Sequence, residues 1–241
     1  MRRWLRTSGL SITTELTKRP TTPLFIVLEG GDGAGKTTQV ALLSLWFDDL
    51  GLSYVSTREP GGTAVGEAIR EIVLAGPEMD MPAETELMLI LGARAAFVRD
   101  VVRPALADGK LVIADRFSLS TMAYQGYGRG LDLDQVKRTV TIATRGLTPD
   151  LYIVLDLPGD EGEDRQSREA ESPDRIEAEG RSFRDTVREA YLHLAATEPD
   201  VTVVSAMGTP EEVQGRIREE LVARFPATFA DSEMIEPGGA G

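Results

Sequence analysis

The chain has 241 residues, 41% of them apolar, and a formal net charge of −13. This length and apolar content suffice for one α/β domain with its own core, whereas the charge argues against a broad nucleic-acid-binding surface, which needs clustered positive charge. No run of 18 apolar residues is present to span a membrane, and the absence of cysteine excludes disulfides and fits a reducing compartment, so we expect a cytoplasmic protein.

The two ends of the chain differ in composition from its middle. Residues 1–23 are rich in Ser, Thr and Arg and contain a single acid, Glu15. Their composition is that of a transit peptide, but they lack the apolar core of a secretory signal. We expect a disordered extension or a misplaced start site there and a disordered tail over residues 226–241, so that residues 24–225 form the folded domain.

Strands and helices are predicted to alternate within that domain. Continuous apolar runs of the kind found in strands buried on both faces occupy residues 24–29, 54–57, 111–115, 151–156 and 201–206. Helical patterns fill the intervals, at about 36–50, 63–75, 84–107, 119–126, 132–145, 181–197 and 209–224. Such alternation predicts a parallel sheet covered by helices on both faces, with ligands at the carboxyl ends of the strands.

A glycine-rich loop follows the first predicted strand. Gly30 to Thr37 read GGDGAGKT and match G-x-x-x-x-G-K-[ST], with a strand before the motif and an amphipathic helix after it. Backbone N–H groups and the helix N-terminus would face the phosphates of a nucleotide, Lys36 would reach its terminal phosphates, and Thr37 would bind Mg²⁺. The predicted nucleotide-binding residues are Gly30, Gly31, Gly33, Ala34, Gly35, Lys36, Thr37 and Thr38.

The motif indicates a nucleoside triphosphate but leaves the reaction open. A GTPase switch is one alternative, because DLPG at residues 156–159 imitates a γ-phosphate sensor. It lies about 120 residues beyond the loop, and no lysine sits in a guanine-reading motif.

A kinase needs a second anion site, for which arginines are the natural donors. The candidates are Arg58, Arg94 and Arg116, which lie at strand ends or on an apolar helix. For Arg94 the alternative is a buried ion pair with Glu86 or a neighbour.

Two further features bear on the predicted chemistry. Asp115, at the tip of its strand, could hold Mg²⁺-bound water or pair with the arginine that follows it. Residues 158–180 are highly charged and poor in apolar side chains, which indicates a loop, a lid or a solvated helix pair.

The segments FIVLEGGDGAGKTTQ, TREPGGT, GARAAFV, DRFSLSTMAYQGYGRG and DRIEAEG together resemble the thymidylate kinase family of nucleoside monophosphate kinases, in order and spacing, over about residues 24–223. The resemblance implies a P-loop NTPase fold with a five-stranded parallel sheet and a charged lid. It also implies transfer of the γ-phosphate of ATP to dTMP with Mg²⁺, and a homodimer built from helices.

The resemblance also implies site residues. Asp32 would approach the 3′-hydroxyl of the acceptor sugar, Arg58 and Arg94 would hold the acceptor phosphate, and Arg116 would lie close to it. Lid arginines would add a cation to the transferred group. The base and sugar would be faced by Ser120, Tyr124 and Gln125, and the lid arginines would be Arg165 and Arg168, with Arg175 behind them.

Two positions depart from the family pattern. Ile90 stands where the family commonly has a phenylalanine that stacks on thymine, and Ala96 replaces a polar residue, often Gln. Stacking on an aromatic ring contributes roughly 1–3 kcal/mol. The alternative is therefore a kinase for another deoxynucleoside monophosphate, including one with a modified pyrimidine.

Overall fold

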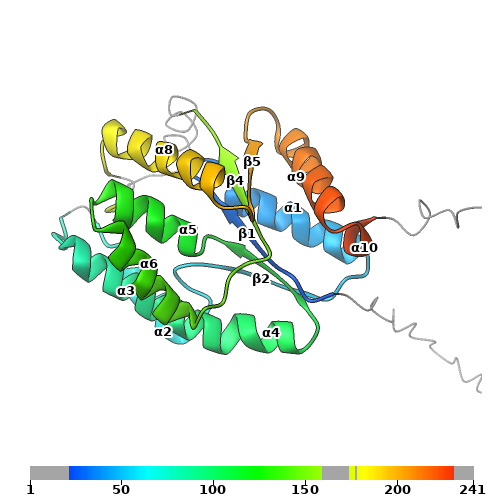
Figure 1. Cartoon of the computed structure of the whole chain (residues 1–241), viewed down its shortest axis with the longest axis horizontal. Coiled ribbons are helices and arrows are strands. Elements are labelled where there is room, and N and C mark those ends of the chain that lie inside the picture. The colour runs from blue at the N-terminus through cyan, green and yellow to red at the C-terminus, as the bar shows by residue number, and fades with distance from the viewer. Residues whose placement is uncertain (1–21, 77, 159–173, 177, 231–241) are drawn as a thin grey trace, which may run out of the picture.

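The computed structural model describes residues 22–76, 78–158, 174–176 and 178–230. Five parallel strands form one sheet in the order β2-β3-β1-β4-β5. Helices cover the sheet on both sides (Figure 1), which confirms the predicted fold class. The strands are β1 (Phe25–Glu29), β2 (Tyr54–Arg58), β3 (Leu111–Asp115), β4 (Leu151–Asp156) and β5 (Val201–Ser205).

The central strands β1 and β3 are apolar up to their last residues, Glu29 and Asp115, because both of their faces are covered. Every residue of β1 and β3 is buried. Alternate side chains of a strand point to opposite faces, so Ile26 and Leu28 enter one core cluster, whereas Phe25 and Val27 enter the other. The absence of polar alternation in the sequence is thus the signature of a two-sided core.

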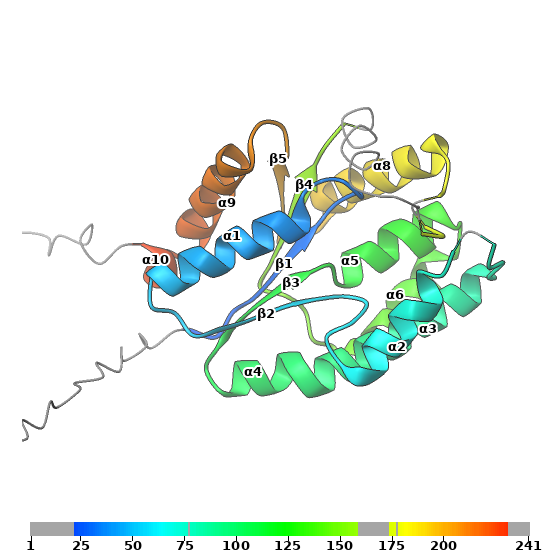
Figure 2. The same cartoon turned by 180° about the vertical axis from the view of Figure 1, so that it is seen from behind.

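The helices fall into two groups (Figures 1 and 2). One side of the sheet carries α1 (Lys36–Asp49), α9 (Pro210–Arg224) and α10 (Pro226–Phe229). The other side carries α2 (Ala64–Val73), α3 (Ala83–Phe97), η1 (Val98–Val102), α4 (Arg103–Ala107), α5 (Ser118–Thr121), η2 (Met122–Gly128), α6 (Leu133–Thr144) and α8 (Arg181–Thr197). No helix in the described part of the chain is long and apolar enough to cross a membrane.

The predicted end of the folded domain at residue 225 is too early. Pro226 opens the short helix α10, and Phe229 within it is 2% exposed. Its ring stacks on Trp46 and Phe47 of α1, with centroids 5.4 and 5.6 Å apart. This aromatic contact buries enough apolar surface to fix the chain through residue 230. Residues 1–21 and 231–241 lie outside the described residues.

The strand order fixes where a ligand can bind. β1 pairs with β3 on one side and with β4 on the other, so the connections after β1 and β3 leave the same edge of the sheet. Ligands of open α/β sheets occupy such a point. The glycine-rich loop follows β1, Glu59 follows β2 and Arg116 follows β3, which brings all three to this edge.

Candidate active site

The glycine-rich loop has the backbone that a phosphate cradle requires. Gly30 and Gly35 have φ angles of 134° and 84°, where glycine is favoured. A Cβ on Gly30 would also lie 2.5 Å from the carbonyl oxygen of Leu155, so no larger residue fits there. Helix α1 begins directly at Lys36, and its N-terminal N–H groups are therefore available to an anion.

Lys36 is held inside this loop. Its ammonium group donates to the carbonyl oxygen of Gly31 at 2.7 Å, and the residue is 7% exposed. Burial and the nearby positive charge of Arg116 lower the pKa of Lys36 to about 8, against the opposing pull of Asp115 and Asp32. The free site therefore holds a lysine that loses its proton more readily than an exposed one.

We expect triphosphate binding to take up a proton above pH 8. An anionic phosphate favours the charged ammonium, so a Lys36 that is neutral in the free protein at pH 9 is protonated in the complex. By linkage, affinity falls by up to about tenfold per pH unit above pH 8. Calorimetric titration with Mg²⁺–ATP in two buffers of different ionisation enthalpy measures the uptake, which rises from near zero at pH 6.5 towards one at pH 9. Lys36→Arg is the control, since a guanidinium stays protonated; equal uptake by both proteins would contradict the expectation.

A pair of oxygen donors lies beside the lysine. The hydroxyl of Thr37 donates to Oδ2 of Asp115 at 2.7 Å, although the two residues belong to α1 and β3. A hydroxyl and a carboxylate together suit Mg²⁺, which takes few protein ligands and completes its shell with water and phosphate oxygens. The residues present therefore fit the predicted metal, and Asp115 pairs with Thr37 rather than with Arg116.

Two cavities adjoin at this edge of the sheet. The first, here called the P-loop cavity, is lined by Asp32, Gly33, Ala34, Gly35, Lys36, Thr37, Thr38, Gln39, Arg58, Glu59, Arg70, Asp115, Arg116, Gly208, Pro210 and Val213. The second, here called the acceptor cavity, is lined by Asp32, Glu59, Pro60, Arg70, Val73, Leu74, Ile90, Arg94, Arg116, Ser120, Thr121, Tyr124, Gln125, Asp174 and Ile176. Four residues line both: Asp32, Glu59, Arg70 and Arg116.

Arg116 is the most connected of the four. Its guanidinium donates to the carbonyl oxygen of Gly30 at 2.9 Å and to the hydroxyls of Ser120 and Tyr124 at 3.2 Å each, and it forms an ion pair with Asp32. The backbone of Arg116 has φ 72°, a left-handed conformation that is uncommon outside glycine. These contacts hold the Arg116 guanidinium in place between the P-loop cavity and the acceptor cavity, as expected of a residue that positions anions.

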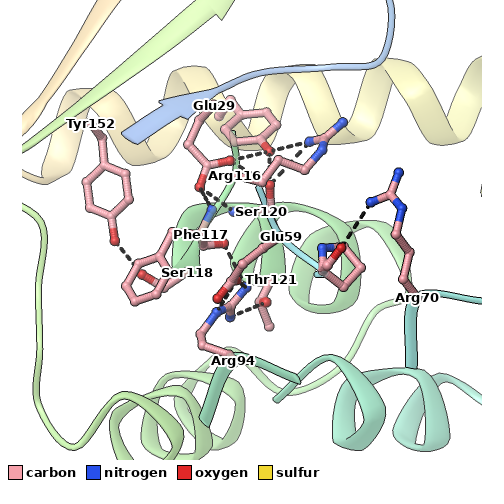
Figure 3. Close-up of polar contacts among 12 residues, drawn as sticks. Glu29, Glu59, Arg70, Arg94, Arg116, Phe117, Ser118, Ser120, Thr121 and Tyr152 are labelled. Carbon is pink, nitrogen blue, oxygen red and sulfur yellow. Dashed lines mark hydrogen bonds and ion pairs between the residues drawn. The ribbon is translucent and has the colours of Figure 1, made fainter. Parts of the chain in front are cut away.

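Arg94 is almost completely buried at the acceptor cavity. It is 1% exposed and donates to Glu59 at 2.7 Å, to the hydroxyl of Thr121 at 2.7 Å and to the carbonyl oxygen of Phe117 at 3.0 Å (Figure 3). Its ion-pair partner is thus Glu59, not Glu86. Burial raises the pKa of Glu59 to about 7, even though Arg94 opposes the shift. Since Arg94 lines only the acceptor cavity, its position suits the end remote from the triphosphate.

The other predicted arginine at a strand end is placed differently. Arg58 is half exposed and pairs with Glu67 at 3.0 Å, and it lines the P-loop cavity but not the acceptor cavity. Arg70 was missed by the sequence reasoning. It reaches the boundary from α2, where its guanidinium donates to the carbonyl oxygen of Pro60 at 3.1 Å. No motif marks Arg70, because a single arginine on an amphipathic helix reads as a surface residue.

Most of the remaining predicted residues line the acceptor cavity, and two lie outside the described residues. Asp32, Ile90, Ser120, Tyr124 and Gln125 all line the acceptor cavity, and Tyr124 donates to Asp32 at 3.0 Å. Ser120 also donates to Glu29, a fully buried carboxylate that the sequence reasoning did not assign and whose pKa is raised by burial. Arg165 and Arg168, the proposed lid arginines, lie outside the described residues. Ala96, the other departure, is buried in α3.

The triphosphate-binding loop lines a cavity that adjoins a second one, and Arg70 and Arg116 line both. This arrangement defines a P-loop phosphotransferase that acts on a small acceptor. A family model described as thymidylate kinase matches residues 28–217. Two Synechococcus thymidylate kinases, from strains JA-2-3B'a(2-13) and JA-3-3Ab, are 45% and 48% identical to the chain over 211 and 208 residues, covering 87% and 84% of it and 100% and 99% of their own length. The crystal structure of thymidylate kinase from Ehrlichia chaffeensis superposes with a TM-score of 0.67 at 27% identity, covering 83% of this chain and 98% of that one. The chain belongs to the thymidylate kinase family.

Proposed function

We propose that the chain transfers the γ-phosphoryl group of ATP to dTMP, giving dTDP and ADP. One observation carries this proposal: the P-loop cavity and the acceptor cavity share Arg70 and Arg116 at their boundary. Two phosphate groups that approach each other repel, and guanidinium groups between them offset that repulsion. Neither a nucleotide switch nor a regulator needs a second cavity of this kind.

On the donor side, the backbone of residues 30–35 and the ammonium of Lys36 bind the β- and γ-phosphates. Mg²⁺, when held by Thr37 and Asp115, neutralises phosphate charge. The transfer needs no protein nucleophile: an oxygen of the acceptor phosphate forms a bond to the γ-phosphorus, and the bond to the leaving ADP oxygen breaks. Lys36 and Arg116 stay in place while charge redistributes, so little reorganisation is required.

On the acceptor side, Arg70 and Arg116 hold the phosphate at the boundary. We assign to Asp32, whose carboxylate already accepts from Tyr124, the role of accepting from the sugar 3′-hydroxyl. We assign Arg94 to the base end of the cavity, and Arg58, which pairs with Glu67, to the support of that residue. These proposed roles of Arg58 and Arg94 differ from those that the family resemblance implies.

The identity of the acceptor is tested by a panel of nucleoside monophosphates. We expect ADP release to be stimulated by dTMP far more than by dUMP, dCMP, dGMP or the ribonucleotide UMP. Ile90 offers apolar contact to the base but no aromatic ring, so preference for another deoxynucleotide would support the alternative acceptor. Slow GTP hydrolysis indifferent to every monophosphate would instead support a nucleotide switch and exclude the proposal.

We further propose a homodimer, as the family resemblance implies, and large exposed apolar side chains on three neighbouring helices support it. Val65, Ile72, Met88 and Ile142 on α2, α3 and α6 are 52%, 45%, 59% and 75% exposed. Large exposed apolar residues on adjacent elements are typical of an interaction surface. The proposed occupant is a second copy of the chain, so sedimentation should give twice the chain mass of 26.2 kDa; a concentration-independent monomer would exclude it.

A further inference from the structure

A buried carboxylate lies behind the acceptor cavity. Glu86 on α3 is 1% exposed, and a buried charge of this kind is costly unless it is paired. It accepts from the amide of Gln125 at 2.6 Å, from Arg175 at 2.6 Å and from Arg129 at 3.2 Å. Burial pushes its pKa upward, but the hydrogen bond from Gln125, the charge of Arg129 and the hydrogen bond from Arg175 outweigh burial and lower it. Glu86 is therefore ionised at neutral pH and can only accept hydrogen bonds.

Arg175 joins this carboxylate to the wall of the cavity. It is 8% exposed; its backbone N–H donates to the carbonyl oxygen of Ala75 at 3.1 Å, and its guanidinium donates to that of Val73 at 3.2 and 3.3 Å. Its two neighbours, Asp174 and Ile176, line the acceptor cavity. Arg175 thus fastens one wall to the end of α2 while its charge stabilises Glu86.

The carboxylate in turn fixes a side chain that lines the cavity. Gln125 has both donor and acceptor capacity at its planar amide, and an acceptor-only partner draws the nitrogen end towards itself. Its Nε2 lies against Glu86, so the carbonyl oxygen is turned the other way. Rotation of the amide would place two acceptors against each other and leave buried polar groups unsatisfied, which disfavours that orientation.

We propose that the Arg175–Glu86 pair is a specificity-determining unit: together with Arg129, Arg175 holds the Glu86 carboxylate against Gln125. The carboxylate fixes which end of the Gln125 amide the acceptor cavity presents, and thereby sets selectivity among pyrimidine bases. Arg175 is a positioning residue that acts through Glu86 and Gln125. The proposal rests on the proposed function, because it assumes that the acceptor base enters this cavity.

The chemistry of the bases makes the orientation of the amide consequential. Thymine and uracil present an N–H donor and a carbonyl acceptor where cytosine presents an acceptor and an amino donor. An amide held in one orientation matches one of these patterns and leaves unpaired groups against the other. Polar sites of this type discriminate strongly because the wrong ligand leaves buried polar groups unsatisfied.

The test compares Arg175→Met, Arg175→Lys and Glu86→Gln with the unmodified full-length chain. For each protein, kcat and KM are measured for dTMP, for dCMP and for ATP, together with the thermal midpoint. Methionine removes the charge and lysine keeps it. Glutamine at position 86 keeps the shape but can donate, which removes the constraint on the amide. Arg181→Met is the matched control, since Arg181 is 60% exposed and lies 3.8 Å from Asp185.

For Arg175→Met and Glu86→Gln we expect the ratio of kcat/KM for dTMP over dCMP to fall by about tenfold, which corresponds to about 1.4 kcal/mol. KM for ATP should stay within about twofold. Arg175→Lys should keep most of the selectivity because it keeps a cation beside Glu86, and the control should behave as the unmodified chain. Should Arg175→Met fail to fold, Glu86→Gln decides. A lower thermal midpoint with unchanged selectivity would assign the pair a structural role and overturn the proposal. Failure of the unmodified chain to phosphorylate dTMP would instead refute the proposed function.

Discussion

Lys36→Met should lower kcat by on the order of 10³-fold and leave the fold intact. Loss of one preorganised cation or donor at the site of charge development typically costs 10²–10³ in kcat, and Lys36 is the ammonium enclosed by the phosphate loop. Its removal also eliminates a buried charge whose pKa is already depressed by burial, so the free protein should not be destabilised. Coupled ADP release under saturating ATP and dTMP measures the effect, and thermal unfolding confirms the fold.

The matched control for Lys36→Met is Lys110→Met. Lys110 is an exposed lysine that pairs with Asp108 at 3.1 Å, away from both cavities, and its loss should leave kcat within about twofold, as for surface substitutions in general. If Lys36→Met turned over at a rate comparable to the unmodified chain, the glycine-rich loop would have no part in the transfer.

The strands and helices were predictable because their signals are local. The apolar runs that form β1, β3 and β4 are buried on both faces. A continuous apolar run is typical of a strand buried in this way. The triphosphate loop was predictable for a similar reason, since the motif occupies eight consecutive residues. In α10 the local signal misled: four residues that begin with a proline indicate little about structure, whereas the ring contacts of Phe229 with Trp46 and Phe47 depend on a distant helix.

The acceptor side was less predictable because its residues depend on contacts between distant segments. The pairing of Arg94 with Glu59 was not predicted, because Glu59 lies 35 positions away in the sequence. Arg70 reaches the boundary only because α2 packs beside the loop that follows β2. No spacing rule in the sequence distinguishes these two arginines from Arg58, which lies at a strand end and pairs with Glu67.

Arg116→Met should lower kcat/KM for dTMP by about 10²–10³-fold, the range seen when a group that stabilises transition-state charge is removed. Arg116 lines both cavities and is anchored by Gly30 and Ser120, so the phosphate groups would lose their shared cation. Asp32 would lose its ion-pair partner as well. Its carboxylate would then add repulsion towards both substrates.

A double-mutant cycle separates these two effects. Asp32→Asn in the Arg116→Met background removes the unpaired carboxylate and should recover part of the lost kcat/KM, whereas Asp32→Asn alone removes a hydrogen-bond acceptor for the sugar and should lower it. Coupling of this sign is expected for groups in direct contact. Arg116→Lys keeps the charge but loses the planar guanidinium that donates to Gly30, Ser120 and Tyr124. Its kcat/KM should therefore lie between those of the unmodified chain and Arg116→Met. Additive effects of the two substitutions on kcat/KM would show that Arg116 and Asp32 act separately. If kcat/KM of Arg116→Met stayed within about threefold of that of the unmodified chain, Arg116 would have no role in the transfer.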